Sequence, residues 1–182
     1  MIHYHGTPIT PRSVLMSMAG KHFCVSFGTT SKGDVDVCLA IGQSLLFDNG
    51  AFSIHTAGKT PNWDGFYRWL EPRIANPHFA IVPDVIDGDV DEQRDLLRQW
   101  PFPKQLAAPV WHMAQPIDFL LELANGGWGK ICFGSSKNLW KIGTSAWETK
   151  CDEAFNALSR NGHLPWVHML RGLSPVSYTH LT

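Results

Sequence analysis

Short apolar segments alternate along the chain with longer amphipathic ones. Seven apolar segments have the length of a β-strand, and several are rich in β-branched or aromatic residues, as strands are. These segments are Ile2–His5, Phe23–Phe27, Leu45–Phe47, Phe79–Val82, Pro109–Trp111, Ile131–Phe133 and Trp166–Leu170. The alternation predicts an α/β protein in which helices cover a parallel sheet.

Four intervening segments carry apolar residues at intervals of three or four, the spacing of one helix face. They are Trp63–Ala75, Val90–Trp100, Ile117–Ala124 and Ser145–Ser159. Asn62 and Asp89 directly precede the first two segments, and both residue types cap helix N-termini. The sequence Asn125-Gly126-Gly127 is a helix stop after the third.

Nearly every predicted strand has a polar or charged residue at its C-terminal end. These residues are His5, Asp48, Asp84, His112, Ser135 and Arg171. Chemistry at the strand ends is typical of the (β/α)8 TIM barrel, which usually needs about 250 residues. The chain has 182 residues, so we expect such a barrel over residues 1–175, truncated after about seven strands.

The last seven residues, VSYTHLT, resemble one reading frame of an adapter used in sequencing libraries. We therefore expect residues 176–182 to be a non-native tail, with the natural sequence ending near Pro175. Such a tail is expected to pack against nothing.

Composition limits the classes of protein to consider. With 44% hydrophobic residues, 17% charged residues and a net charge of −1, the chain suits one globular domain rather than a disordered one. From this net charge we expect no large basic surface, so that any contact with nucleic acid would depend on local positive charges. The four cysteines, Cys24, Cys38, Cys132 and Cys151, form no CxxC pair, which disfavours a disulfide framework or a zinc ribbon.

The N-terminal sequence MIHYHGTPITP lacks the pattern of a signal peptide, and no apolar run is long enough to span a membrane. The expected location is cytoplasmic, without a membrane partner.

Two acidic residues are candidates for chemistry. Asp48 lies where a predicted strand meets Asn49-Gly50, a pattern that is also an ordinary turn. Asp84 lies between an apolar strand and a predicted helix start, so a buried or half-buried carboxylate is expected there. Two carboxylates at neighbouring strand ends can divide acid, base, nucleophile and ligand roles, as in glycosyl transfer.

Four further residues at strand ends are candidates for substrate binding. Gly134 and Ser135 offer backbone amides suited to a phosphate or a heteroaromatic ring edge. His112 either bonds a substrate or is a satisfied core histidine. Arg171 is a cation that can pair with a carboxylate or stack on a base.

The strings YHGTPITP, LLFDNGAFS, FAIVPDVIDGD, PVWHM, CFGSS and HMLRGL occur in this order. Together they resemble a phage and bacterial branch of the tRNA-guanine transglycosylase superfamily, nearest to its deazapurine DNA-modification (DNA-guanine transglycosylase-like) proteins. The resemblance extends to Ser174. It implies a (β/α)8 barrel that exchanges guanine for a 7-deazaguanine base in nucleic acid, with DNA favoured over tRNA.

By this resemblance Asp48 matches the catalytic acid of the family's Asp-Ser-Gly-Gly-Phe loop, with Asn49 and Ala51 in place of Ser and Gly. Asp84 matches the acid that binds the purine edge.

The resemblance also assigns the remaining substrate-binding positions. Gly134 and Ser135 match backbone groups that contact the base, and Arg171 matches a side chain that covers its face. His112 stands where many members have glutamine.

The family's nucleophilic aspartate and its zinc ligands lie further along its sequence. The resemblance therefore implies no cofactor in this chain, and base binding without exchange.

Two other interpretations are open. His3 and His5 on the first strand, with His112 and His168 on later ones, resemble the metal site of amidohydrolase-type barrels. The chain can also be a non-catalytic barrel that binds a purine or nucleic acid.

Overall fold

Parallel strands follow one another in chain order around a curved sheet. The computed structural model describes residues 2–28, 34–135 and 137–170. The first sheet has the order β1 (Tyr4–Gly6), β2 (His22–Ser26), β3 (Ser44–Asp48), β4 (Phe79–Ile81) and β5 (Ala107–Ala108). The second has the order β6 (Val110–His112), β7 (Lys130–Gly134) and β8 (Trp166–Met169). Every pairing is parallel, as predicted.

Pro109, the first residue of the fifth predicted strand, separates β6, which matches that strand, from the unpredicted two-residue β5. Proline has no N–H to donate to a neighbouring strand, so the regular ladder is interrupted there. The chain still joins the two sheets at this point. Val82 N donates to Ala108 O over 3.1 Å on one side, and Cys132 N donates to Pro109 O over 2.8 Å on the other.

The described residues contain seven α-helices and two short 3-10 helices. They are α1 (Arg12–Ser17), α2 (Asp34–Ile41), α3 (Ala51–Thr56), α4 (Trp63–Leu70), α5 (Val90–Gln99), α6 (Ile117–Asn125), α7 (Ser145–Arg160), η1 (Lys104–Leu106) and η2 (Lys137–Leu139). None of these helices is long and apolar enough to cross a membrane.

All four predicted helices are confirmed, and both predicted N-caps are correct. Asn62 accepts from Gly65 N, and Asp89 forms a capping box with Glu92. The expected end of the first of these helices at Ala75 was wrong, because α4 stops at Leu70. After Leu70 the chain forms a tighter turn, in which Arg73 N donates to the carbonyl oxygen of Leu70, three residues earlier.

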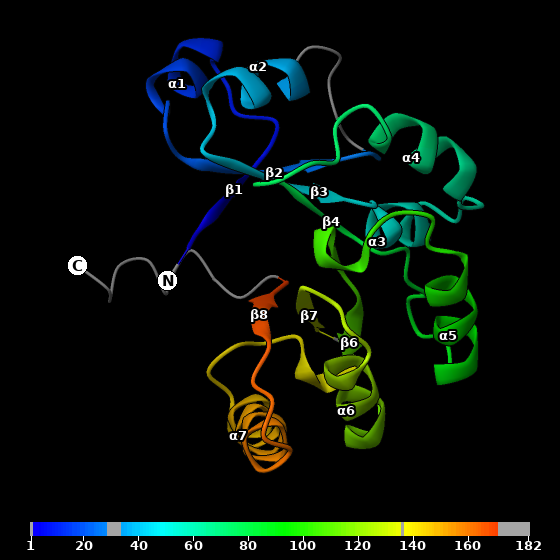
Figure 1. Ribbon diagram of the computed structural model, residues 1–182. Coiled ribbons are helices and arrows are strands. Elements are labelled where there is room, and N and C mark those ends of the chain that lie inside the picture. Colours follow the sequence, from blue (N-terminus) through cyan, green and yellow to red (C-terminus); the bar gives the residue numbers. More distant parts are fainter. Residues whose placement is uncertain (1, 29–33, 136, 171–182) are drawn as a thin grey trace.

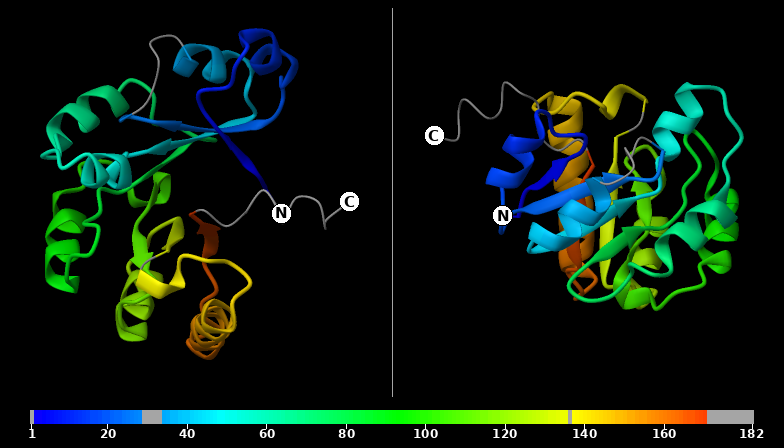
Figure 2. Two further views of the ribbon diagram at one scale, coloured as in Figure 1. Left: turned by 180° about the vertical axis from the view of Figure 1, so that it is seen from behind. Right: turned by 90° about the horizontal axis from the view of Figure 1, so that it is seen from above.

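Most helices lie along the outer side of the curved sheet, which opens between β1 and β8 (Figures 1 and 2). Apolar side chains fill two outer layers, one under α1, α2 and α4 and one under α6 and α7. A third cluster lies on the inner face and draws on every strand. It contains Leu46, Phe79, Ile81, Ala108, Val110 and Cys132, with Tyr4, Cys24, Trp166 and Leu170 packed against it.

The two ends of the sheet approach each other without hydrogen-bonding. The rings of Tyr4 on β1 and His168 on β8 lie 5.6 Å apart, centroid to centroid. Among the described strands β1 pairs only with β2, and β8 only with β7. An α/β fold with parallel sheets is therefore confirmed, whereas closure into a barrel is not seen. Arg171 and the expected tail at 176–182 lie outside the described residues.

Candidate functional site

The C-terminal ends of the parallel strands bring the predicted site residues to one edge of the sheet. Asp48 ends β3, His112 lies at the end of β6, and Gly134 lies at the end of β7. His112 and Gly134 are register partners on neighbouring strands. Asp84 follows β4, which pairs with β3. Ser135 follows Gly134 directly and is half-buried.

Asp84 is buried, with 7% of its surface exposed, and its carboxylate is held by Asn49. The Asn49 amide donates 2.8 Å to Asp84 Oδ1 and 2.9 Å to Val82 O. Asn49 Oδ1 accepts from Ala51 N over 2.7 Å. The amide therefore ties the end of β3 to the segment that follows β4.

Asn49 was not among the predicted site residues. The sequence signal was an asparagine between a strand-end aspartate and a glycine, which is equally the signal of a surface turn. Its 1% exposure is what distinguishes it from a turn residue.

His112 reaches the other oxygen of the same carboxylate. Its Nε2 lies 3.0 Å from Asp84 Oδ2, at an angle too bent for a regular hydrogen bond. The backbone N–H of His112 donates 3.0 Å to Gln115 Oε1, which fixes the loop after β6. The imidazole is almost fully buried and lies against a carboxylate, but Nε2 has no regular hydrogen bond, so His112 is a core histidine that is not fully satisfied. A bond from His112 to a substrate stays a prediction.

Gly134 provides the space in which the His112 ring lies. A β-carbon at position 134 would lie 2.8 Å from His112 Nδ1 and 2.9 Å from Val110 Cγ1. Both contacts are shorter than real side chains tolerate. Glycine at this position is thus a packing requirement of the site.

Asp48 is half-buried and electrostatically coupled to Asp84. Burial raises the pKa of the Asp48 carboxyl; the Gly50 N–H, which donates to Oδ1 over 3.2 Å, and Ser26 lower it, and the charge of Asp84 raises it. The net direction is upward. A carboxyl with a raised pKa is suited to act as a general acid.

Two cysteines lie close enough to these carboxylates for the carboxylate charges to affect the pKa of their thiols. Burial raises the pKa of the Cys132 thiol well above its usual range, and the charges of Asp84 and Asp48 raise it further. The pKa of Cys24 is raised by burial and by Asp48. Both thiols are free, Cys132 being buried and Cys24 half-buried. Thiols held in the neutral form are unreactive, so neither is a nucleophile candidate.

No protein family model, curated protein or solved structure matches this chain. The function of the site therefore has to follow from its own geometry.

The histidines proposed for a metal site are dispersed. His3 and His5 have ring centroids 4.3 Å apart, and His5 lies against Phe23, in the outer core layer. His168 stacks on Trp166, while His112 contacts Asp84. Within the described part of the chain, no three His, Cys, Asp or Glu side chains are grouped to hold a metal ion.

Proposed function

We propose that this chain binds a purine-type base at the C-terminal strand ends and is a guanine/7-deazaguanine transglycosylase-like protein of the base-exchange pentosyltransferase type, which by itself binds the base without exchanging it. The observation that supports this most directly is the carboxylate pair. Asn49 donates a hydrogen bond to one oxygen of Asp84 and His112 Nε2 lies 3.0 Å from the other, while burial and the charge of Asp84 raise the pKa of Asp48.

The two carboxyls thus have different surroundings, and base exchange requires carboxyl groups with different roles. In base exchange a carboxylate bonds to the anomeric carbon as the bond to the purine breaks, and the resemblance places that nucleophile further along the family's sequence. The leaving purine must receive a proton in the same step, and a carboxyl with a raised pKa can supply it. We assign that role to Asp48. Asp84 is assigned to recognition, because a carboxylate oxygen that already accepts one hydrogen bond retains lone pairs for an N–H of the base.

We propose that the sheet is a TIM-type barrel that lacks a closing strand. The inner cluster draws side chains from every strand, as the interior of a (β/α)8 barrel does. The first and last strands also approach closely enough for Tyr4 and His168 to pack edge to face.

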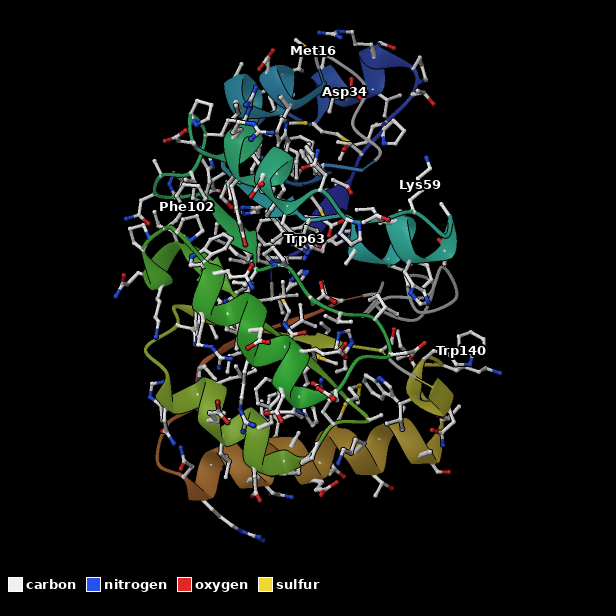
Figure 3. The ribbon with its side chains drawn as sticks, turned by 90° about the vertical axis from the view of Figure 1, so that its right-hand side faces the viewer. Met16, Asp34, Lys59, Trp63, Phe102 and Trp140 are labelled. Carbon is white, nitrogen blue, oxygen red and sulfur yellow. The ribbon has the colours of Figure 1, made fainter. Side chains whose placement is uncertain are left out.

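Nucleic acid is the proposed partner, with DNA favoured over tRNA by the sequence resemblance. A target nucleotide must be flipped or single-stranded to reach the strand ends. Trp140 is 63% exposed after η2, and it projects on the same side of the molecule as Lys59 (Figure 3). Exposed aromatic rings and lysines together are typical of surfaces that grip single strands. Next to Trp140, residues that include Met113 and Lys150 line an open depression in the surface.

Calorimetric titration with guanine and 7-deazaguanine bases tests the proposal. Asp84→Asn places an amide donor against an N–H donor, which costs roughly 1–3 kcal/mol and weakens binding about tenfold or more. Asp48→Asn is expected to weaken binding less, because its proposed role is proton transfer. Asp87→Asn is the control, since Asp87 is in the same loop as Asp84 but has 61% of its side chain exposed.

The folding of each variant is checked by circular dichroism before titration. Absence of base binding by the folded parent chain would overturn the proposal. So would equal affinities in the parent chain and in a folded Asp84→Asn variant.

A further inference from the structure

A continuous line of contacts runs across the ends of four strands. It begins at Asn49 after β3, passes to Asp84 after β4, continues to His112 on β6, and ends at Gly134 on β7. Asn49, Asp84 and His112 are each more than nine-tenths buried. The hydrogen bonds of the Asn49 side chain restrict Asn49 and Asp84 to one orientation, because a rotation of the amide would leave Asp84 Oδ1, Val82 O or Ala51 N without its partner.

The two nitrogens of His112 have different surroundings. Nε2 faces the Asp84 carboxylate at 3.0 Å, whereas Nδ1 lies on the side of Gly134, 2.8 Å from where a β-carbon would be. An ionised carboxylate has only acceptor sites and attracts the nitrogen that carries the proton. The carboxylate is itself fixed by the Asn49 amide, which can only donate to Asp84 Oδ1 through its N–H.

We propose that Asp84 and His112 form one unit in which the carboxylate keeps the imidazole proton on Nε2, leaving Nδ1 as an acceptor for an N–H of the ligand. In this unit Asn49 is a positioning residue for the carboxylate, and Asp84 both orients the ring and accepts from the base. The bent contact between Nε2 and Oδ2 is compatible with this role, since site hydrogen bonds in unliganded proteins often straighten only when ligand binds. The identity of the ligand as a base with N–H donors rests on the proposed function.

The proposed unit is a specificity element of the site. A base that offers two neighbouring N–H donors meets two acceptors, a carboxylate oxygen and Nδ1. A heterocycle that offers acceptors at that edge would place its lone pairs against the lone pairs of the carboxylate oxygen and Nδ1. Binding is then weaker, because the two protein acceptors are left without a donor. Hypoxanthine, which lacks the exocyclic amino group of guanine, is therefore expected to bind about tenfold or more weakly than guanine.

The tautomer can be observed directly in the whole chain without any ligand. Long-range 1H–15N spectra at neutral pH distinguish a protonated ring nitrogen from a bare one, and the His112 signals are those lost in His112→Gln. We expect His112 as the Nε2–H tautomer. In Asp84→Asn the side chain can turn an N–H toward the ring, so the preference for Nε2–H should fall.

Gly134→Ala tests the same unit without altering any polar group. The added methyl is expected to displace the ring, shift the His112 signals and weaken guanine binding about tenfold or more. Gly6→Ala is the matched control, because Gly6 is also the last residue of a strand and no atom lies within 4 Å of the methyl group that this substitution would add. It should change neither readout.

A parent spectrum with His112 protonated on Nδ1, or on both nitrogens, would overturn the inference. So would unchanged His112 signals in folded Gly134→Ala. The expected tautomer with no base binding would instead contradict the proposed function, whereas the wrong tautomer with normal base binding would contradict the Asp84–His112 unit alone.

Discussion

Gly28 and Gly50 approach each other backbone to backbone beside the site. Gly50 has φ +78°, and a β-carbon on it would lie 3.0 Å from Gly28 N and 3.2 Å from Gly28 Cα. Gly50 also donates its N–H to Asp48 and precedes α3. The geometry of the Asp48 loop therefore depends on the absence of a side chain at position 50.

Gly50→Ala is expected to destabilise the fold by more than the left-handed backbone alone accounts for. Gly58→Ala measures that backbone cost, about 1–2 kcal/mol, because Gly58 has φ +62° with no atom near its missing side chain. The collision with Gly28 should add roughly 1–3 kcal/mol in Gly50→Ala. Urea unfolding of both variants gives the comparison, and equal losses would show that the close approach carries no energetic weight.

Asn49→Leu is expected to lower the free energy of unfolding by about 1–3 kcal/mol, because it leaves Asp84 Oδ1 buried without its donor. Asn161→Ala is the control, since its amide pairs with Asn125 at an exposed position. The control should stay within about 0.5 kcal/mol of the parent chain. A similar, small effect of both substitutions would mean that the Asn49 bridge does not stabilise the site.

Asp48→Asn is expected to stabilise the protein at neutral pH. The folded state raises the pKa of the Asp48 carboxyl, mainly by burial, so the folded protein holds this proton more tightly than the unfolded chain does. The contribution of Asp48 to stability is present below the unfolded pKa of about 3.9 and is lost as pH rises through the folded pKa. Replacing it by a neutral amide removes that loss.

Unfolding of Asp48→Asn measured at pH 4 and pH 7 checks the sign. The variant should gain stability relative to the parent chain as pH rises. Asp84→Asn provides the contrast, because its new N–H donors face the Asn49 amide and should destabilise the fold. A loss of stability at pH 7 in both variants would contradict the different environments assigned to the two carboxyls.

His168 should make the protein sensitive to mild acid. Burial and the charge of His3 lower the pKa of His168 to about 4, against about 6.5 in an unfolded chain. As pH falls from about 6.5 to about 4 the unfolded chain takes up the proton first, so stability decreases over this window by up to about 3 kcal/mol.

His168→Phe keeps an aromatic ring between Trp166 and Tyr4 and should reduce this acid sensitivity. Urea unfolding at several pH values between 7 and 4 provides the measurement. His163→Gln, an exposed-histidine control, should follow the parent chain. A His168→Phe curve parallel to that of the parent would show that His168 does not contribute to the pH dependence.

The sequence determined those elements whose signals are local. Asn62 and Asp89 cap the helices that they were expected to cap, because a cap needs only a side chain and N–H groups two or three residues away. The strands were likewise predictable from short apolar runs. By contrast α1 and α3 were not predicted, since helices of six residues carry little periodicity. The helix α2 was missed because its apolar residues are spread around the helix and mark no single face, unlike those of α4, which has the same length.

The sequence also marked Asp48, Asp84, His112 and Gly134 as strand-end residues, but it did not show how they touch. The bond between Asn49 and Asp84 joins residues 35 positions apart, and the contact of His112 with Gly134 joins two strands. Such contacts depend on how neighbouring strands are aligned and how the sheet curves. These are properties of the packed chain and leave no periodic signal in the sequence, so only the tertiary structure decided that a turn-like asparagine is buried against the Asp84 carboxylate.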